Sequence, residues 1–202
     1  MRNRRQHIER LLAYAAFTLG SVQVLLVLVS WVITAAMPEV FARSLLSPEG
    51  IRWFFGHFTS NLASPLLVWL LLGSIAWGAV RGSGVLHPDF TEYRQRFAYR
   101  LVGCELAVFA VIILLLTVVP RAILLNVMGG LLPSSFTSSL FPYLCFVATI
   151  AGMSFGWVSQ RLRDLPSLLR ALSGGIAEAA PLMVIYVLAT QLFYSCLYLF
   201  TS

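Results

Sequence analysis

The most constraining feature of this sequence is the run Leu101–Val119, which reads LVGCELAVFAVIILLLTVV and contains a single charged residue, Glu105. An α-helix rises about 1.5 Å per residue, so a run of this length would cross a hydrocarbon core of roughly 30 Å. Within a bilayer a helix satisfies its own backbone hydrogen bonds, which a single open strand cannot do. Arg100 precedes the run and Pro120-Arg121 follows it. The run therefore predicts a transmembrane helix.

The composition extends this prediction to the whole chain. Of its 202 residues, 59% are hydrophobic and 11% are charged, whereas soluble domains contain about 25% charged residues. The sequence therefore predicts an all-α, polytopic integral membrane protein whose partner is the lipid bilayer. A net charge of +6 would suggest nucleic acid in a soluble chain, but every basic residue is an arginine. These arginines lie between the apolar runs, where they indicate membrane topology and not a nucleic-acid surface.

Four more apolar runs resemble the first, and together they predict a single membrane domain. The five transmembrane helices are expected at about residues 11–37, 62–80, 101–119, 140–158 and 179–200. The first apolar run is longer than the 7–15 residues or so of a signal-peptide core, so it is expected to be retained. Two interfacial helices are expected at about 48–59, after the helix start Ser47-Pro48-Glu49, and at about 165–173, before Gly174-Gly175.

The arginines are distributed unevenly among the connections. Residues 1–10, 81–100 and 160–178 hold eleven of the fourteen arginines, and the alternating connections hold the other three. Because cytoplasmic loops carry an excess of basic residues, the N-terminus is predicted to be cytoplasmic and the C-terminus outside. The expected location is the inner (plasma) membrane.

The sequence also contains a candidate inverted repeat. Ala63–Val68 and Ala179–Val184 are identical at four of six positions. Each segment follows a predicted interfacial helix and a full span, and the two would enter the membrane in opposite directions. Many transporters are built from such repeats.

Polar residues inside the apolar runs are the candidate functional residues, because they are costly in a bilayer. Glu105 and Glu178 lie near predicted cytoplasmic helix ends, where each could act in transport or proton relay, or pair with an arginine such as Arg100 or Arg170. Gln23 and Gln191 lie deeper, and interhelical hydrogen bonding is the alternative to a direct role for them.

Small residues one turn apart predict close helix contacts. Gly152 and Gly156 form a G-x-x-x-G pair, and Ser74 and Gly78 form a similar pair. Such pairs let helix backbones approach each other, either within one chain or between subunits. The histidines lie outside the spans and the cysteines occur singly, so neither a metal site nor a cofactor is expected, and the chain is not expected to be an enzyme.

The segment Leu45–Phe54 (LLSPEGIRWF), followed by Asn61 and Pro65-Leu66, resembles the early part of the AbgT family of p-aminobenzoyl-glutamate transporters. Later segments are similar in order, among them Ser134-Ser135-Phe136, Asp164-Leu165-Pro166 and Gln191-Leu192-Phe193. The resemblance covers about residues 40–86 and 95–198. It implies a transporter fold, and Gln191 is the one position to which a substrate-related role could carry over.

The chain departs from that family in two places. The loop between Leu86 and Tyr93 is short where the family has its first substrate hairpin, and the second hairpin would begin where the chain ends. The resemblance therefore implies a short form that lacks both hairpins.

Two functions remain open on the sequence alone. One is a transporter-derived scaffold or accessory subunit, homo-oligomeric or bound to a membrane partner subunit. The other is a minimal oligomeric transporter of a small organic solute such as p-aminobenzoyl-glutamate. A dry helix seam would favour the first, and a polar cavity between subunits would favour the second.

Overall fold

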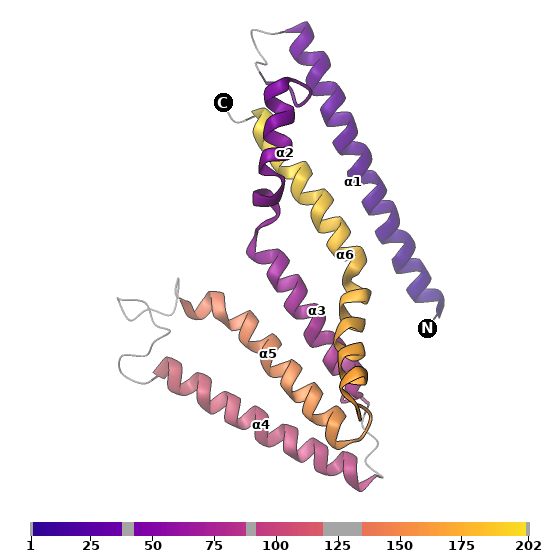
Figure 1. The fold of residues 1–202 in the computed structure, drawn as a ribbon, viewed down its shortest axis with the longest axis vertical. Helices are drawn as coiled ribbons and strands as arrows, with labels where there is room; N and C mark the ends of the chain where they lie inside the picture. The colour runs from indigo at the N-terminus through magenta and orange to yellow at the C-terminus, as the bar shows by residue number, and fades with distance from the viewer. Residues whose placement is uncertain (1, 38–42, 88–91, 119–134, 201–202) are drawn as a thin grey trace. The chain divides into compact units, whose positions relative to one another are not determined.

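The computed structural model describes residues 2–37, 43–87, 92–118 and 135–200, and these residues form six helices without a strand (Figure 1). The helices are α1 (Arg2–Ala36), α2 (Pro48–Leu62), α3 (Pro65–Ser83), α4 (Tyr93–Val118), α5 (Ser135–Val158) and α6 (Leu165–Phe200). All except α2 are long and apolar enough to cross a membrane. The predictions of an all-α fold and of five transmembrane helices are therefore confirmed.

Helix α2 begins as the sequence predicts. Ser47 is its N-cap, and the Ser47 side chain accepts a hydrogen bond of 3.0 Å from the backbone N–H of Gly50. Pro48 occupies the first turn, where its missing N–H costs nothing, and Glu49 lies where the helix dipole favours a negative charge. With 15 residues α2 is too short to span a bilayer. Its location in the interface stays a prediction.

Helix α6 corrects the prediction of a separate helix at 165–173. Residues 165–173 and the span 179–200 form one helix of 36 residues, with Pro181 inside it. The expected helix end at Gly174-Gly175 is absent, because Gly175 permits a contact between helices and does not end one. A Cβ atom on Gly175 would lie 2.0 Å from the carbonyl oxygen of Ser74 on α3, so the glycine permits a close helix contact.

The two halves of the candidate inverted repeat are also similar in the length of their helical segments. Residues 48–83, which contain α2 and α3, span 36 residues, as α6 does. The two matched prolines differ in context, because Pro65 begins α3 whereas Pro181 lies within α6. The repeat itself stays a prediction.

The chain divides into two compact units. The first unit comprises Met1–Leu67 and Ala180–Ser202, and so contains α1, α2, the start of α3 and the C-terminal part of α6. The second comprises Val68–Ala179, with most of α3, all of α4 and α5, and the N-terminal part of α6.

The apolar core of the second unit lies between α4 and α5. Ala98 and Val102 of α4 pack there with Ala151 and Phe155 of α5, and Phe155 is fully buried. Few residues of the spans are buried: the buried share of the most apolar 18-residue window runs from 6% in α1 to 33% in α5. Such extensive apolar surface requires lipid or another protein surface around it.

Candidate functional site

Helices α2 and α3 are separated by an interruption of two residues. Ala63 has φ −74° and ψ 62°, outside the helical region, and Pro65 has no N–H with which to continue the backbone hydrogen bonds of α2. The backbone N–H of Ser64 donates to the carbonyl of Leu62 at 2.8 Å, and that of Leu67 donates to the carbonyl of Ser64 at 3.2 Å. Membrane transporters use interrupted helices of this kind at their solute sites.

Tyr186 of α6 supplies hydrogen bonds at this interruption. Its Oη donates to the carbonyl oxygen of Leu62 at 3.0 Å and lies 2.6 Å from Oγ of Ser64. Backbone groups freed by an interruption need partners within a bilayer, where water is absent. Tyr186 therefore stabilises the interruption from a neighbouring helix.

Gln191 connects α6 to α2 one turn further along. Its Nε2 donates to the carbonyl oxygen of Phe58 at 3.2 Å, and only 4% of the residue is exposed. Asn61 lies about one helical turn beyond Phe58 and is 7% exposed. Gln191 Oε1 and Asn61 Nδ2 are buried without a hydrogen-bond partner in the described part of the chain.

Gln23 joins α1 to the same face of α6. Its Nε2 donates to Oγ of Ser195 at 2.9 Å, and Ser195, one turn after Gln191, is fully buried. Gln23 Oε1 is the third atom in this region that is buried and unpaired within the described residues. The polar cluster, as we name it here, consists of Gln23, Asn61, Ser64, Tyr186, Gln191 and Ser195.

The unpaired atoms distinguish the polar cluster from ordinary helix packing. Most buried polar atoms in proteins are hydrogen-bonded, and each exception calls for an explanation such as a ligand or bound water. In a membrane the cost of an unpaired polar group is at least as high, because no bulk solvent compensates it. Three such atoms lie on three helices of the first unit, Gln23 Oε1 on α1, Asn61 Nδ2 on α2 and Gln191 Oε1 on α6.

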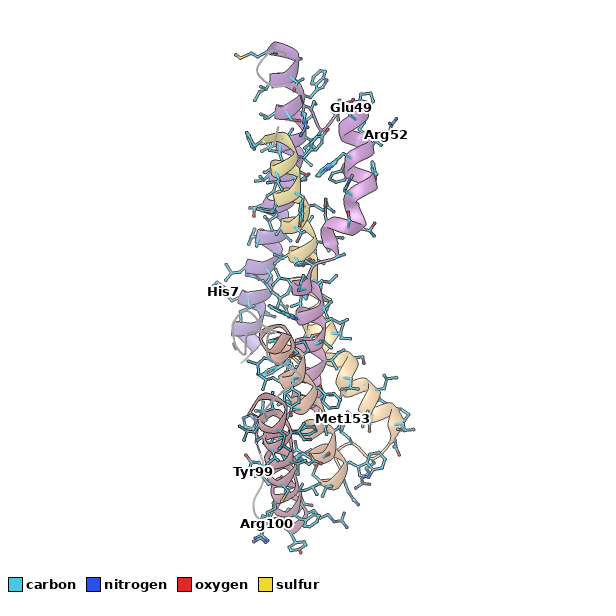
Figure 2. All side chains as sticks on the ribbon, turned by 90° about the vertical axis from the view of Figure 1, so that its left-hand side faces the viewer. His7, Glu49, Arg52, Tyr99, Arg100 and Met153 are labelled. Carbon is cyan, nitrogen blue, oxygen red and sulfur yellow. The ribbon has the colours of Figure 1, made fainter. Side chains whose placement is uncertain are left out.

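An aromatic stack follows the polar cluster along α6. The ring of Tyr198 stacks on that of Trp53 with centroids 4.4 Å apart, and His57 stacks on the other side of Trp53 at 5.7 Å. The guanidinium of Arg43 lies 5.5 Å from the centre of the Tyr198 ring. Glu49 and Arg52 lie in the first two turns of α2 (Figure 2), and Trp53 directly follows Arg52. The positive charge of Arg43 therefore lies beside Tyr198, one helical turn after Ser195.

The two glutamates predicted as functional candidates belong to the second unit. Glu178 of α6 forms an ion pair with Arg81 of α3, and its Oε2 accepts a hydrogen bond of 3.2 Å from Nε1 of Trp77. Glu105 lies on α4, and its Oε2 is buried without a partner among the residues the structure describes. Their roles in transport or proton relay stay predictions.

The four small residues predicted for helix packing all lie at close contacts inside the second unit. A Cβ atom on Gly78 would lie 2.5 Å from the Ala171 carbonyl oxygen of α6, and one on Gly152 would lie 2.8 Å from backbone atoms of Ala79. Ser74 contributes the carbonyl that meets Gly175, and a Cβ on Gly156 would meet the side chain of Leu162. A role in subunit contacts stays a prediction.

Four residues of the polar cluster were not identified as candidates from the sequence: Asn61, Ser64, Tyr186 and Ser195. Asn61 occurs there only within a family resemblance, and the other three are common residue types in membrane helices. The contacts of Ser64, Tyr186 and Ser195 join positions more than a hundred residues apart, such as Gln23 with Ser195. A local pattern contains no signal for contacts of that range.

Taken together, these features define a multi-pass membrane protein in which a two-residue break separates α2 from α3. The structure is similar to the crystal structure of the YdaH transporter of Alcanivorax borkumensis, described as having an unusual topology, with a TM-score of 0.77 and 14% sequence identity. The match covers 91% of this chain and 70% of that chain. YdaH is an AbgT-family transporter, and at this identity the similarity shows the fold alone. No family model and no curated protein matches the sequence.

Proposed function

We propose that this chain is a transport subunit related to AbgT-type transporters, and that the polar cluster forms part of the path of a small organic solute such as p-aminobenzoyl-glutamate. The observation that carries the proposal is that Gln23, Asn61 and Gln191, on α1, α2 and α6, each have a buried side-chain atom without a hydrogen-bond partner among the described residues. Polar side chains inside a membrane are costly to keep and commonly mark substrate pathways. Apolar side chains would pack the same helices at a lower desolvation cost.

The chemistry of the first unit supports a solute with amide and acidic groups. The amide side chains of Gln23, Asn61 and Gln191 provide hydrogen bonds for a neutral amide. Arg43, beside Tyr198, adds a positive charge for a carboxylate and an aromatic neighbour for a ring. A positive charge would offset the free energy that an anionic solute loses on leaving water. Apolar spans alone would not offset it.

The scaffold or accessory subunit is the second candidate function, and the glycine contacts of the second unit favour it. Backbones that approach as closely as those at Gly78 and Gly175 suit a frame that holds other elements in place. The seam of the first unit is polar, which favours transport over the scaffold. A short form without both substrate hairpins remains part of either proposal.

Either function requires an assembly in a membrane. The small buried share of the spans supports contact with lipid and with other subunits, whether copies of this chain or a membrane partner. We place the assembly in the inner membrane with the N-terminus cytoplasmic and the C-terminus outside, as the arginine distribution predicts.

Flux measurements with purified chain in sealed liposomes test the transport proposal. We expect saturable uptake of labelled p-aminobenzoyl-glutamate above that of empty vesicles, reduced at least tenfold by Gln191→Leu. Gln6→Leu makes the same chemical change at an exposed position of α1 and should leave the uptake unchanged. A properly assembled protein without uptake would favour the scaffold.

Accessibility measurements test the proposed orientation. In a variant without Cys104, Cys145 and Cys196, a cysteine at Gln160 should react only with a reagent on the cytoplasmic side, and one at Arg52 only with a reagent outside. Labelling of both positions from one side would contradict the five-span topology.

A further inference from the structure

An open apolar groove lies in the second unit, where the beginning of α4, the end of α5 and the beginning of α6 meet. Its volume is about 400 Å³, and its lining residues are Leu101, Met153, Ser154, Trp157, Val158, Leu165 and Leu168. Trp157 is 55% exposed and Leu165 is 72% exposed. Because these apolar side chains are not covered by the chain itself, the groove opens to the surroundings of the protein.

Arginines lie close in sequence to groove residues on two elements. Arg100 directly precedes Leu101, and Figure 2 shows it near the beginning of α4, with Met153 on α5. Arg161 and Arg163 lie in the six-residue connection between Val158 and Leu165. Asp164 in that connection and Glu105, one turn after Leu101 on α4, are the neighbouring acidic residues, so the three arginines outnumber them.

The two arginines of the connection are held in different ways. Arg163 is exposed, and its Nε donates to the carbonyl oxygen of Gln160 at 3.2 Å. The guanidinium of Arg161 lies against Gly84, where a Cβ atom would collide with it. Gly84 has φ +77°, a conformation that favours glycine for a second reason. Arg163 is thus the exposed arginine of a connection that runs between two groove residues, Val158 and Leu165.

We propose that this groove binds one anionic glycerophospholipid, with an acyl chain along its apolar walls and the phosphate beside Arg100 and Arg163. Guanidinium groups bind phosphate through paired, charge-assisted hydrogen bonds. The exposed indole of Trp157 suits the headgroup level of a bilayer. Basic pockets between transmembrane helices on the cytoplasmic side bind anionic headgroups in general, and the arginine distribution predicts that this end faces the cytoplasm.

The arginines near the groove favour an anionic lipid over a zwitterionic one. A zwitterionic lipid would fill the apolar walls equally well but would leave the excess positive charge uncompensated. An anionic headgroup compensates it, with an expected gain in affinity of about fivefold per arginine contact. The proposal is independent of solute transport, because it concerns no residue of the polar cluster.

Quenching of Trp157 by brominated lipids tests the proposal on the full chain in bilayers of phosphatidylcholine. The signal of Trp157 is the difference between the wild-type chain and Trp157→Phe, which removes the contributions of the other tryptophans. We expect brominated phosphatidylglycerol to bind beside Trp157 at least fivefold more tightly than brominated phosphatidylcholine with the same acyl chains. The ratio should approach one in the variant carrying Arg100→Gln and Arg163→Gln.

Two controls keep the result specific. Arg52→Gln removes an exposed arginine from α2 in the other unit and should leave the ratio unchanged. In the wild-type chain, 1 M NaCl should lower the ratio severalfold, because exposed charge contacts are screened by salt. This second comparison needs no variant and so does not depend on how variants fold.

Three results would overturn the proposal. The first is equal binding of both lipids to the wild-type chain. The second is a ratio that the double arginine variant does not change. The third is Trp157 quenched by neither lipid while a cysteine at Ser154 cross-links to a second copy, which would assign the groove to a subunit contact.

Discussion

The two units hold their helices together by different means. In the first unit, α6 contacts α1 and α2 through side-chain hydrogen bonds, such as Gln23 to Ser195 and Gln191 to the Phe58 carbonyl. In the second unit, α3 contacts α5 and α6 through glycines that bring backbones together, such as Gly152 and Gly175. Both are recognised ways to pack membrane helices, where the hydrophobic effect does not drive association.

The difference has consequences for adaptability. A glycine contact tolerates almost no displacement or enlargement, because backbone atoms cannot move aside as side chains can. A seam of amide and hydroxyl groups can exchange one hydrogen-bond partner for another, including a solute or water, at a modest net cost. The second unit therefore has the properties of a frame, and the first unit those of a binding region.

The largest expected change in stability comes from substituting one of two adjacent glycines of α6. Gly175→Ala would place a Cβ atom 2.0 Å from the Ser74 carbonyl oxygen, and we expect it to lower the free energy of unfolding by about 3 kcal/mol or more. Gly174→Ala is the matched control, since no atom lies within 4 Å of its Cβ position. It should raise the free energy of unfolding by about 0.5–1 kcal/mol through helix propensity. Unfolding by denaturing detergent measures both, and equal effects would contradict the close contact.

The helix spans illustrate what the sequence could predict. Runs of about twenty apolar residues with charged flanks need only a local count, because bilayer thickness sets their length. The ends were less predictable, since hydropathy marks the apolar part of a helix and not its hydrogen-bonded extent. Helix α4 thus begins at Tyr93, eight residues before the apolar run, and contains Arg94, Arg96 and Arg100.

Glycine and proline can each have more than one structural role, and the sequence alone did not show which role applies. Gly174-Gly175 suggested the end of a helix, whereas Gly175 is required for a contact with α3. Pro65 and Pro181 occur in matching segments, yet α3 begins at the first and α6 continues through the second. The local sequence is similar at both, so the difference depends on neighbours distant in the chain, among them Tyr186 beside the interruption.

The candidate site was predicted in part for the same reason. Gln23 and Gln191 stand out because an amide in an apolar run is costly. Their partners could not be predicted, since the hydrogen bonds join positions 172 and 133 residues apart. A polar residue in a span can be recognised locally, but the helix that it faces depends on tertiary packing.

The next effect concerns the interruption in the first unit. Tyr186→Phe removes the hydroxyl that contacts Leu62 and Ser64, and leaves a buried carbonyl with one partner fewer. We expect the free energy of unfolding to fall by about 1–2 kcal/mol. Tyr194→Phe on the same helix makes the same chemical change outside the polar cluster. A Tyr186→Phe variant as stable as wild type would show that the interruption does not need this hydroxyl.

A smaller effect is expected for the contact between α1 and α6. A double-mutant cycle of Gln23→Leu and Ser195→Ala should give a coupling free energy of about 0.6 kcal/mol, as is typical for interhelical hydrogen bonds in membranes. The single variant Gln23→Leu also removes an unpaired buried oxygen, so its net effect on stability should be close to zero. A coupling above about 2 kcal/mol would show that the seam is as unyielding as a glycine contact, against the comparison of the two units.

The smallest effect is expected for the ion pair of Arg81 and Glu178. The pair is partly exposed, with 51% of the arginine side chain and 28% of the glutamate side chain accessible. Exposed ion pairs gain little, because water and salt screen the charges and two long side chains lose freedom. A double-mutant cycle of Arg81→Gln and Glu178→Gln should therefore give a coupling of about 0.5 kcal/mol at low salt, falling toward zero in 1 M NaCl.

The glycines beside this pair would then account for most of the stability of the α3–α6 contact. A coupling of several kcal/mol that persists in high salt would instead assign Glu178 a buried electrostatic role, and would favour its predicted role in proton relay.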